Sequence, residues 1–273
     1  RPTDVVWLNA KEITLRGAKA VVGGAQPEEI RATRIGGSDD VMGLKFERPL
    51  PAGDARIALG YTAKIQELGA IGVFRQQEAG RWYVLTQFEP MDARRAFPCF
   101  DEPDMKAEWS LSLVVPRGVR AFANMPVERE TEAAAGMKEV AFASTPRLPS
   151  YLIAFAVGEF DVRDAGRAGR NATPIAIVTP KGRSGEAAYA AARTGAILAA
   201  AEHFFGQPYP FPKLDLVAYP RSSGAMENPG LVTYAARLLL AREDEISPSF
   251  EQRFMGVTAH EIAHPWFGGY VTM

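Results

Sequence analysis

The chain has 273 residues, more than one typical domain, and its 47% hydrophobic and 23% charged residues are the composition of a globular protein with a sizeable core. A total of 31 Lys and Arg against 32 Asp and Glu gives a formal net charge of -1, which offers no broad basic surface for nucleic acid or an anionic membrane. No run of eighteen or more apolar residues appears, so the sequence predicts no membrane-spanning segment.

The single cysteine, Cys99, excludes an internal disulfide and is interpreted as a free, buried thiol. The chain starts at Arg1 and enters a strand-like segment at once. We therefore expect the native N-terminus to be missing, together with any signal peptide, which leaves localisation open between the cytoplasm and export.

From Asp4 to about Val178 the sequence predicts short strands separated by turn residues. Most of these runs are rich in β-branched and aromatic residues, and the run from Trp109 to Leu113 alternates apolar and polar positions as a half-buried strand does. Several such strands in succession indicate an antiparallel sheet domain. The clearest runs are residues 5–8, 55–61, 81–86, 109–115 and 151–157.

The pattern changes after residues 179–182. Ser184 is placed to cap a helix that continues to Phe205, and Gly206 is suited to end it. We therefore place a domain boundary near residue 180, with a β-sheet domain at 1–180 and the first part of a second domain at 181–273. Residues 214–219 and 231–234 are predicted as strands of this second part.

A second helix is predicted to start around residues 247–249, where Ser249 and Gln252 have the spacing of a capping box. This helix carries the sequence His260-Glu261-Ile262-Ala263-His264. Residues i and i+4 share one helix face, so both imidazoles can reach one zinc ion while Glu261 addresses a water. The alternative is a helix with two satisfied histidines and a surface glutamate. The third histidine of the chain, His203, is interpreted as a helix-surface residue.

A second motif lies upstream, at Gly224-Ala225-Met226-Glu227-Asn228. Alone it would pass as a loop with a solvated glutamate. Together with the histidine motif it resembles the zinc aminopeptidases of the aminopeptidase N type, a gluzincin family that includes a leukotriene-processing epoxide hydrolase. Residues 224–228 match that family's exopeptidase motif letter for letter, and residues 86–90, 92–103 and 209–215 are also similar to it. The resemblance implies an α+β fold, with an antiparallel β-sheet N-terminal domain followed by the start of a thermolysin-like catalytic domain.

Carried over to this chain, the resemblance implies a zinc-dependent aminopeptidase that removes N-terminal residues from peptides. His260 and His264 would be metal ligands and Glu261 the general base. Glu227 and Glu89 would bind the α-amine of the peptide, since a carboxylate facing an ammonium group selects a chain end. Gly224 and Ala225 would present backbone groups to the substrate, while Gln87 and Met226 would line the pocket for its first side chain.

Two departures from the family affect these expectations. The family's third zinc ligand, a glutamate, and its transition-state tyrosine both fall beyond Met273, and the first part of the sheet domain is expected to be missing as well. We therefore expect a fragment that holds zinc weakly and has little or no peptidase activity alone. Pro265 stands where the family has a polar residue, and a proline disfavours the helical conformation of the preceding residue, which predicts a kink at His264.

Three other interpretations remain at this stage. An epoxide hydrolase of the same family would carry the same zinc motif. A thermolysin-type endopeptidase would carry the histidines but has no use for residues 224–228. A non-catalytic interaction module on the same scaffold would be expected to lose the motif residues, which are intact here. The preferred N-terminal residue, the physiological substrate and the oligomeric state do not follow from the sequence.

Overall fold

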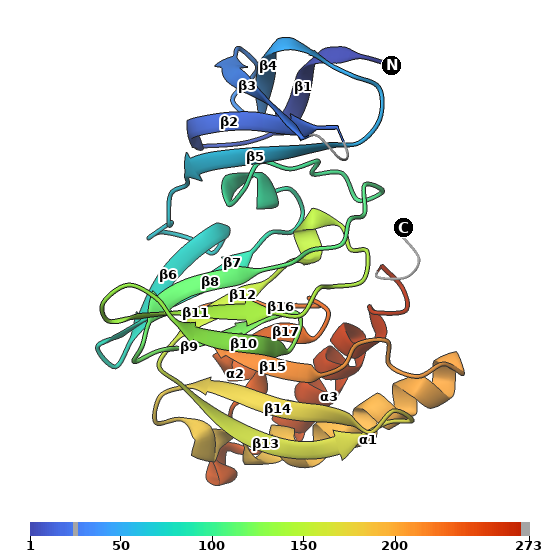
Figure 1. Cartoon of the computed structure of the whole chain (residues 1–273). Coiled ribbons are helices and arrows are strands. Elements are labelled where there is room, and N and C mark those ends of the chain that lie inside the picture. The colour runs from blue at the N-terminus through green and yellow to red at the C-terminus, as the bar shows by residue number, and fades with distance from the viewer. Residues whose placement is uncertain (24–26, 269–273) are drawn as a thin grey trace.

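The computed structural model describes residues 1–23 and 27–268. Its strands form several sheets stacked along the molecule, and the helices gather at the end opposite the N-terminus (Figure 1). Most strand pairs are antiparallel and helices are few, so the α+β class predicted from the sequence is confirmed. No helix within the described ranges is long and apolar enough to cross a membrane.

The first sheet, at the N-terminal end of the molecule, is antiparallel with the order β1-β4-β3-β2-β5 (Figure 1). Its inward-facing side chains, among them Ile30, Leu44 and Phe46, form a hydrophobic core that is separate from the rest. The sheet therefore buries one face by itself, as antiparallel sheets commonly do. Its strands are β1 (Thr3–Asn9), β2 (Thr14–Val22), β3 (Glu28–Ile35), β4 (Val41–Leu50) and β5 (Ala55–Thr62).

Two smaller antiparallel sheets follow, with the orders β6-β7-β12-β9 and β10-β11-β8. Two predicted strands are shorter than expected. Trp109 precedes the strand of its run, because its backbone N–H bonds the Thr145 hydroxyl, and Ser150–Leu152 forms a 3-10 turn. The strands are β6 (Gly72–Glu78), β7 (Arg81–Gln87), β8 (Ser112–Pro116), β9 (Arg120–Ala123), β10 (Val127–Glu132), β11 (Met137–Phe142) and β12 (Phe155–Gly158), and a further 3-10 turn lies at Ala93–Arg95.

The last sheet is mixed, with the order β13-β14-β15-β17-β16. The pairs β14/β15 and β15/β17 are parallel, and β15 and β17 are almost entirely buried, as parallel strands covered on both faces are. Strands from both sides of residue 180 share this sheet, and the boundary placed there stays a prediction. The strands are β13 (Phe160–Ala168), β14 (Thr173–Pro180), β15 (Leu214–Tyr219), β16 (Ala225–Met226) and β17 (Leu231–Ala235).

Helix α1 (Ala188–Phe205) packs against β13, β14 and α3. It ends as predicted at Gly206, which adopts the left-handed conformation at φ 70°. Its start differs from the prediction, because Ser184 opens a 3-10 turn, Ser184–Ala187, and gives no side-chain cap. His203 is exposed on this helix, as expected.

Helix α3 (Pro248–Ala263) is capped by Ser247, whose hydroxyl accepts a hydrogen bond from the Phe250 N–H at 3.3 Å. The predicted capping box at Ser249 and Gln252 is therefore wrong, and the cap lies two residues earlier. The reason is that Pro248 takes the first helical position, where a residue without a backbone N–H is well tolerated. Between α1 and α3 lie the short helix α2 (Ala236–Leu239) and a 3-10 turn at Glu243–Glu245.

Candidate metal and substrate site

The two motif histidines lie at the end of α3 with their rings together. His260 is in the last turn, and His264 directly follows the last helical residue with φ -55° and ψ -35°. Their Nε2 atoms are 3.0 Å apart, and the ring centroids are separated by 4.6 Å. His264 thus keeps a helical backbone before Pro265, and the helix ends here without separating the rings.

The other ring nitrogen of His264 faces the protein. Its Nδ1 lies 3.3 Å from the Phe267 carbonyl oxygen and 3.8 Å from Glu227 Oε1. A carbonyl accepts only, so this contact favours a proton on Nδ1 and leaves a lone pair on Nε2. An Nδ1 contact of this kind to a carbonyl or carboxylate is typical of metal-ligating histidines.

The donor set fits a zinc ion. Two Nε2 lone pairs at 3.0 Å repel one another unless a proton or a cation lies between them, and bonds of about 2.0–2.1 Å from each nitrogen can meet at one ion. Glu261 is buried, and its Oε2 has no hydrogen-bond partner within the described part of the chain. An orphaned carboxylate oxygen close to the His264 imidazole is the polar environment of a cation with its water.

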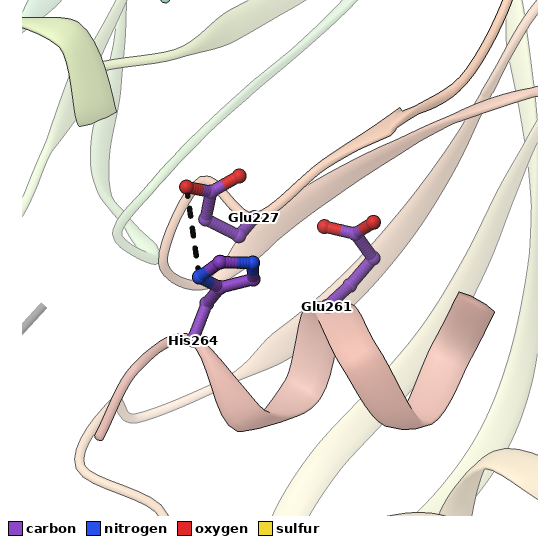
Figure 2. Close-up of side chains that lie close together, drawn as sticks. All are labelled: Glu227, Glu261 and His264. Carbon is purple, nitrogen blue, oxygen red and sulfur yellow. Dashed lines mark ion pairs between the residues drawn. The ribbon is translucent and has the colours of Figure 1, made fainter. Parts of the chain in front are cut away.

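The carboxylates come together around His264 (Figure 2). Ligand atoms of Glu227, Glu261 and His264 all lie within 4.8 Å of one another. The pKa of Glu261 is raised to about 8, because burial disfavours its charged form and the negative charges of Glu227 and Glu89 add to that effect. The site is therefore rich in negative charge and suited to cationic ligands.

A cavity of about 250 Å³ opens beside these groups. Glu89, Glu227 and His264 line it, so the structure brings together both carboxylates that the sequence assigned to amine binding. The pKa of Glu89 is raised by burial and by the charge of Glu227, and His264 opposes this shift. The remaining lining residues are Pro90, Pro103, Tyr151 and Gly268.

Tyr151 was missed by the sequence analysis. Burial, together with the charges of Glu227 and Glu89, raises the pKa of its phenol to about 12. In the sequence, Tyr151 is a single polar hydroxyl at the start of a run predicted to be an apolar strand. Such a hydroxyl does not by itself indicate a binding site.

The upstream motif forms the edge of the mixed sheet. Ala225 and Met226 are strand β16, which pairs antiparallel with Tyr234 and Thr233 of β17. The Gly224 carbonyl accepts a hydrogen bond from the Ala235 N–H at 2.7 Å.

The remaining predicted pocket residues, Met226 and Gln87, belong to two different sheets. Met226 is buried in the main hydrophobic core, and Gln87 ends β7 opposite Gly72. Neither is among the residues lining the 250 Å³ cavity. Their role in a side-chain pocket stays a prediction.

A helix presenting two imidazoles and an intervening glutamate, beside a carboxylate-lined cavity at a sheet edge, is the arrangement of metal-dependent peptidases. The sequence matches two family models, the Peptidase M1 N-terminal domain over residues 1–152 and the Peptidase family M1 domain over residues 189–273. The chain belongs to peptidase family M1.

Its relatives carry aminopeptidase names. Aminopeptidase M1-C of Oryza sativa subsp. japonica is 36% identical over 277 residues, covering 100% of this chain and 31% of its own length. Aminopeptidase N of Acetobacter pasteurianus is 40% identical over 192 residues, covering 70% of this chain and 53% of its own length. Glutamyl aminopeptidase of Sus scrofa is 40% identical over 189 residues, covering 69% and 20%. The chain thus spans about a third of the length of the rice relative.

Proposed function

We propose that this chain carries the substrate-amine site and two metal ligands of a zinc-dependent aminopeptidase. The observation that carries the proposal is the position of Glu227, whose carboxylate oxygen is 3.8 Å from the ring of His264 while both line one cavity. A carboxylate this close to a metal ligand places a peptide's terminal ammonium beside the bond to be cleaved. The relatives' names favour a peptidase over an epoxide hydrolase.

The roles of the side chains follow from their surroundings. Glu227 and Glu89 hold the ammonium group through charge-assisted hydrogen bonds. When bound by His260 and His264, zinc supplies a Lewis acid that acidifies water and polarises the scissile carbonyl. Glu261 accepts the proton of the attacking water at its orphaned Oε2 and returns it to the leaving amine.

Strand β16 would position the peptide backbone. It is the last strand of the mixed sheet, with β17 on one side, so its other edge is open to pairing with an extended peptide. A peptide whose ammonium sits at Glu227 then runs antiparallel to β16, past Met226, Ala225 and Gly224. Gln87 and Met226 are proposed to shape the space for the first side chain.

The test is the substitution Glu227→Gln in the protein at its natural length. It removes the charge that holds the ammonium, so we expect kcat/KM for an alanyl p-nitroanilide to fall at least about a hundredfold, corresponding to about 3 kcal/mol. Glu47→Gln, at an exposed position of β4 in the N-terminal sheet, is the matched control and is expected to change nothing. Cleavage of an N-acetylated substrate at the rate of the free amine, or full activity of Glu227→Gln, would contradict the proposal.

A further inference from the structure

A second and larger cavity, of about 700 Å³, lies where the N-terminal part of the chain meets the segment that leads into β16. Its charged lining residues are Arg75, Arg221, Arg237 and Glu67. Glu67 forms an ion pair with Arg75. Within the described ranges the guanidinium groups of Arg221 and Arg237 hydrogen-bond only to backbone carbonyl oxygens, so no ion pair neutralises their two positive charges.

Each of these two exposed guanidinium groups has one hydrogen bond to the protein. Arg221 Nη2 donates to the Gln77 carbonyl at 3.1 Å, and Arg237 Nη2 donates to the Ser223 carbonyl at 2.7 Å. A guanidinium has five N–H donors, so each contact leaves most of the fork free. Partly free guanidinium forks of this kind match the oxygens of carboxylate and phosphate.

The backbone beneath these side chains is fixed. Gln76, which is 7% exposed, accepts a hydrogen bond from the Arg221 N–H at 2.8 Å and donates to the Arg221 carbonyl. Gln76, which belongs to β6, thereby fixes the backbone at Arg221, where the segment that leads to β16 starts. The cavity is therefore set in a defined position relative to the peptide-binding edge.

The location of the 700 Å³ cavity also indicates which part of a bound peptide could enter it. If the aminopeptidase proposed above binds a peptide along β16, each residue advances about 3.3 Å from Glu227 toward Ser223 and Arg221. The fourth to sixth residues of such a peptide then arrive at the cavity. A negatively charged side chain there would meet Arg221 and Arg237.

We propose that this cavity is an oxyanion site, which takes a carboxylate or phosphate group through Arg221 and Arg237. The group is supplied either by an acidic side chain at the fourth to sixth position of a bound peptide or by a small free anion. This second source requires no peptidase activity, whereas the first rests on the proposed function.

The first experiment is a calorimetric titration of the chain with inorganic phosphate at low ionic strength. We expect binding that weakens at least about tenfold in the double variant Arg221→Gln/Arg237→Gln, because two charge-assisted contacts are lost. Arg31→Gln, an exposed arginine on β3, is the matched control and should leave binding unchanged. Absence of phosphate binding in the unsubstituted chain, or equal binding in the double variant, would overturn the proposal.

The second experiment separates the two sources. The affinities of two hexapeptides with free amino ends are compared, one with Glu and one with Gln at the fifth position. If the Glu peptide binds more tightly than the Gln peptide and this difference disappears in the double variant, the site takes peptide side chains. If the two peptides bind with equal affinity while phosphate still binds, the site takes a free anion. If the aminopeptidase proposal fails, neither peptide binds at Glu227 while the phosphate titration still stands.

Discussion

At the scale of single residues, Cys99 shows how burial controls chemistry. The thiol is 8% exposed, and burial, with a smaller contribution from the charge of Asp101, raises its pKa to about 12 from an ordinary value of 9.0. A raised pKa keeps the thiol protonated over the whole neutral range, and the thiolate is the species that reacts. This agrees with the free, buried cysteine expected from the sequence.

Cys99 is therefore expected to resist alkylation. At pH 8 a pKa of about 12 leaves roughly a thousandfold less thiolate than the ordinary value of 9.0 does. The iodoacetamide reaction of the folded chain should be slower than that of the urea-unfolded chain by at least this factor, and should accelerate about tenfold for each unit of pH. Mass spectrometry of the alkylated fraction measures both. Comparable rates in the folded and unfolded chains would contradict the buried placement.

The candidate site residues were predicted from two kinds of sequence information, helical spacing and the resemblance to a family. His260 and His264 share a face because a helix repeats every 3.6 residues, and the resemblance linked Glu89 and Glu227 across more than a hundred positions. Tyr151 could not be found this way, because its place at the cavity depends on how the segment after Pro149 folds back on the sheets. Long-range packing of that kind leaves no local periodicity.

At the scale of secondary-structure elements, the start of α3 shows what a local sequence pattern can and cannot predict about a helix. The helix was predicted correctly, with His260 in its last turn and His264 directly after its last residue, whereas its cap lies at Ser247 rather than Ser249. Ser247 has the extended backbone of an N-cap, with φ -107° and ψ 161°, and the Ser249 hydroxyl lies 3.0 Å from the Ser247 hydroxyl. Two serines, Ser247 and Ser249, could each have capped the helix. Pro248 takes the first helical position, so Ser247 is the cap.

Ser247→Ala is predicted to destabilise the chain by about 1 kcal/mol, because the Phe250 N–H loses its acceptor at the N-terminus of α3. Ser249→Ala is the matched control, since within the described part of the chain its hydroxyl contacts the Ser247 hydroxyl and no helix N–H, and its cost should stay below about 0.5 kcal/mol. Urea denaturation followed by circular dichroism measures both values. A larger loss for Ser249→Ala than for Ser247→Ala would restore the capping box predicted from the sequence.

At the scale of the whole molecule, one buried side chain joins the sheets. Asn124, which is 2% exposed, donates to the carbonyls of Leu152 and Pro229 and accepts from the Ala154 N–H. Gly230 lies so close that an added Cβ would be 2.1 Å from the Asn124 carbonyl oxygen, and its φ is +74°. The segment after the Glu227 loop is thereby held against the smaller sheets. The sequence suggested the sheets but gave no sign of this connection.

Asn124→Ala is expected to lower the free energy of unfolding by about 2–5 kcal/mol, because three buried backbone groups lose their partners at once. Asn171→Ala, at an exposed asparagine beyond β13, is the control and should change it by less than about 0.5 kcal/mol. Urea titrations of both variants measure the difference. Equal stabilities would show that Asn124 does not connect the sheets.

If His260 and His264 hold one metal ion, a zinc titration of the chain and of its histidine variants will detect it. The chain has 3 histidines, so His203→Gln, on the exposed face of α1, is a matched control for His260→Gln and His264→Gln. Competition with a chromophoric chelator at pH 7.5 should show about one zinc ion per chain, bound at least about tenfold more weakly in either motif variant and unchanged in His203→Gln. Equal zinc affinity in all four proteins would show that His260 and His264 do not share a metal ion.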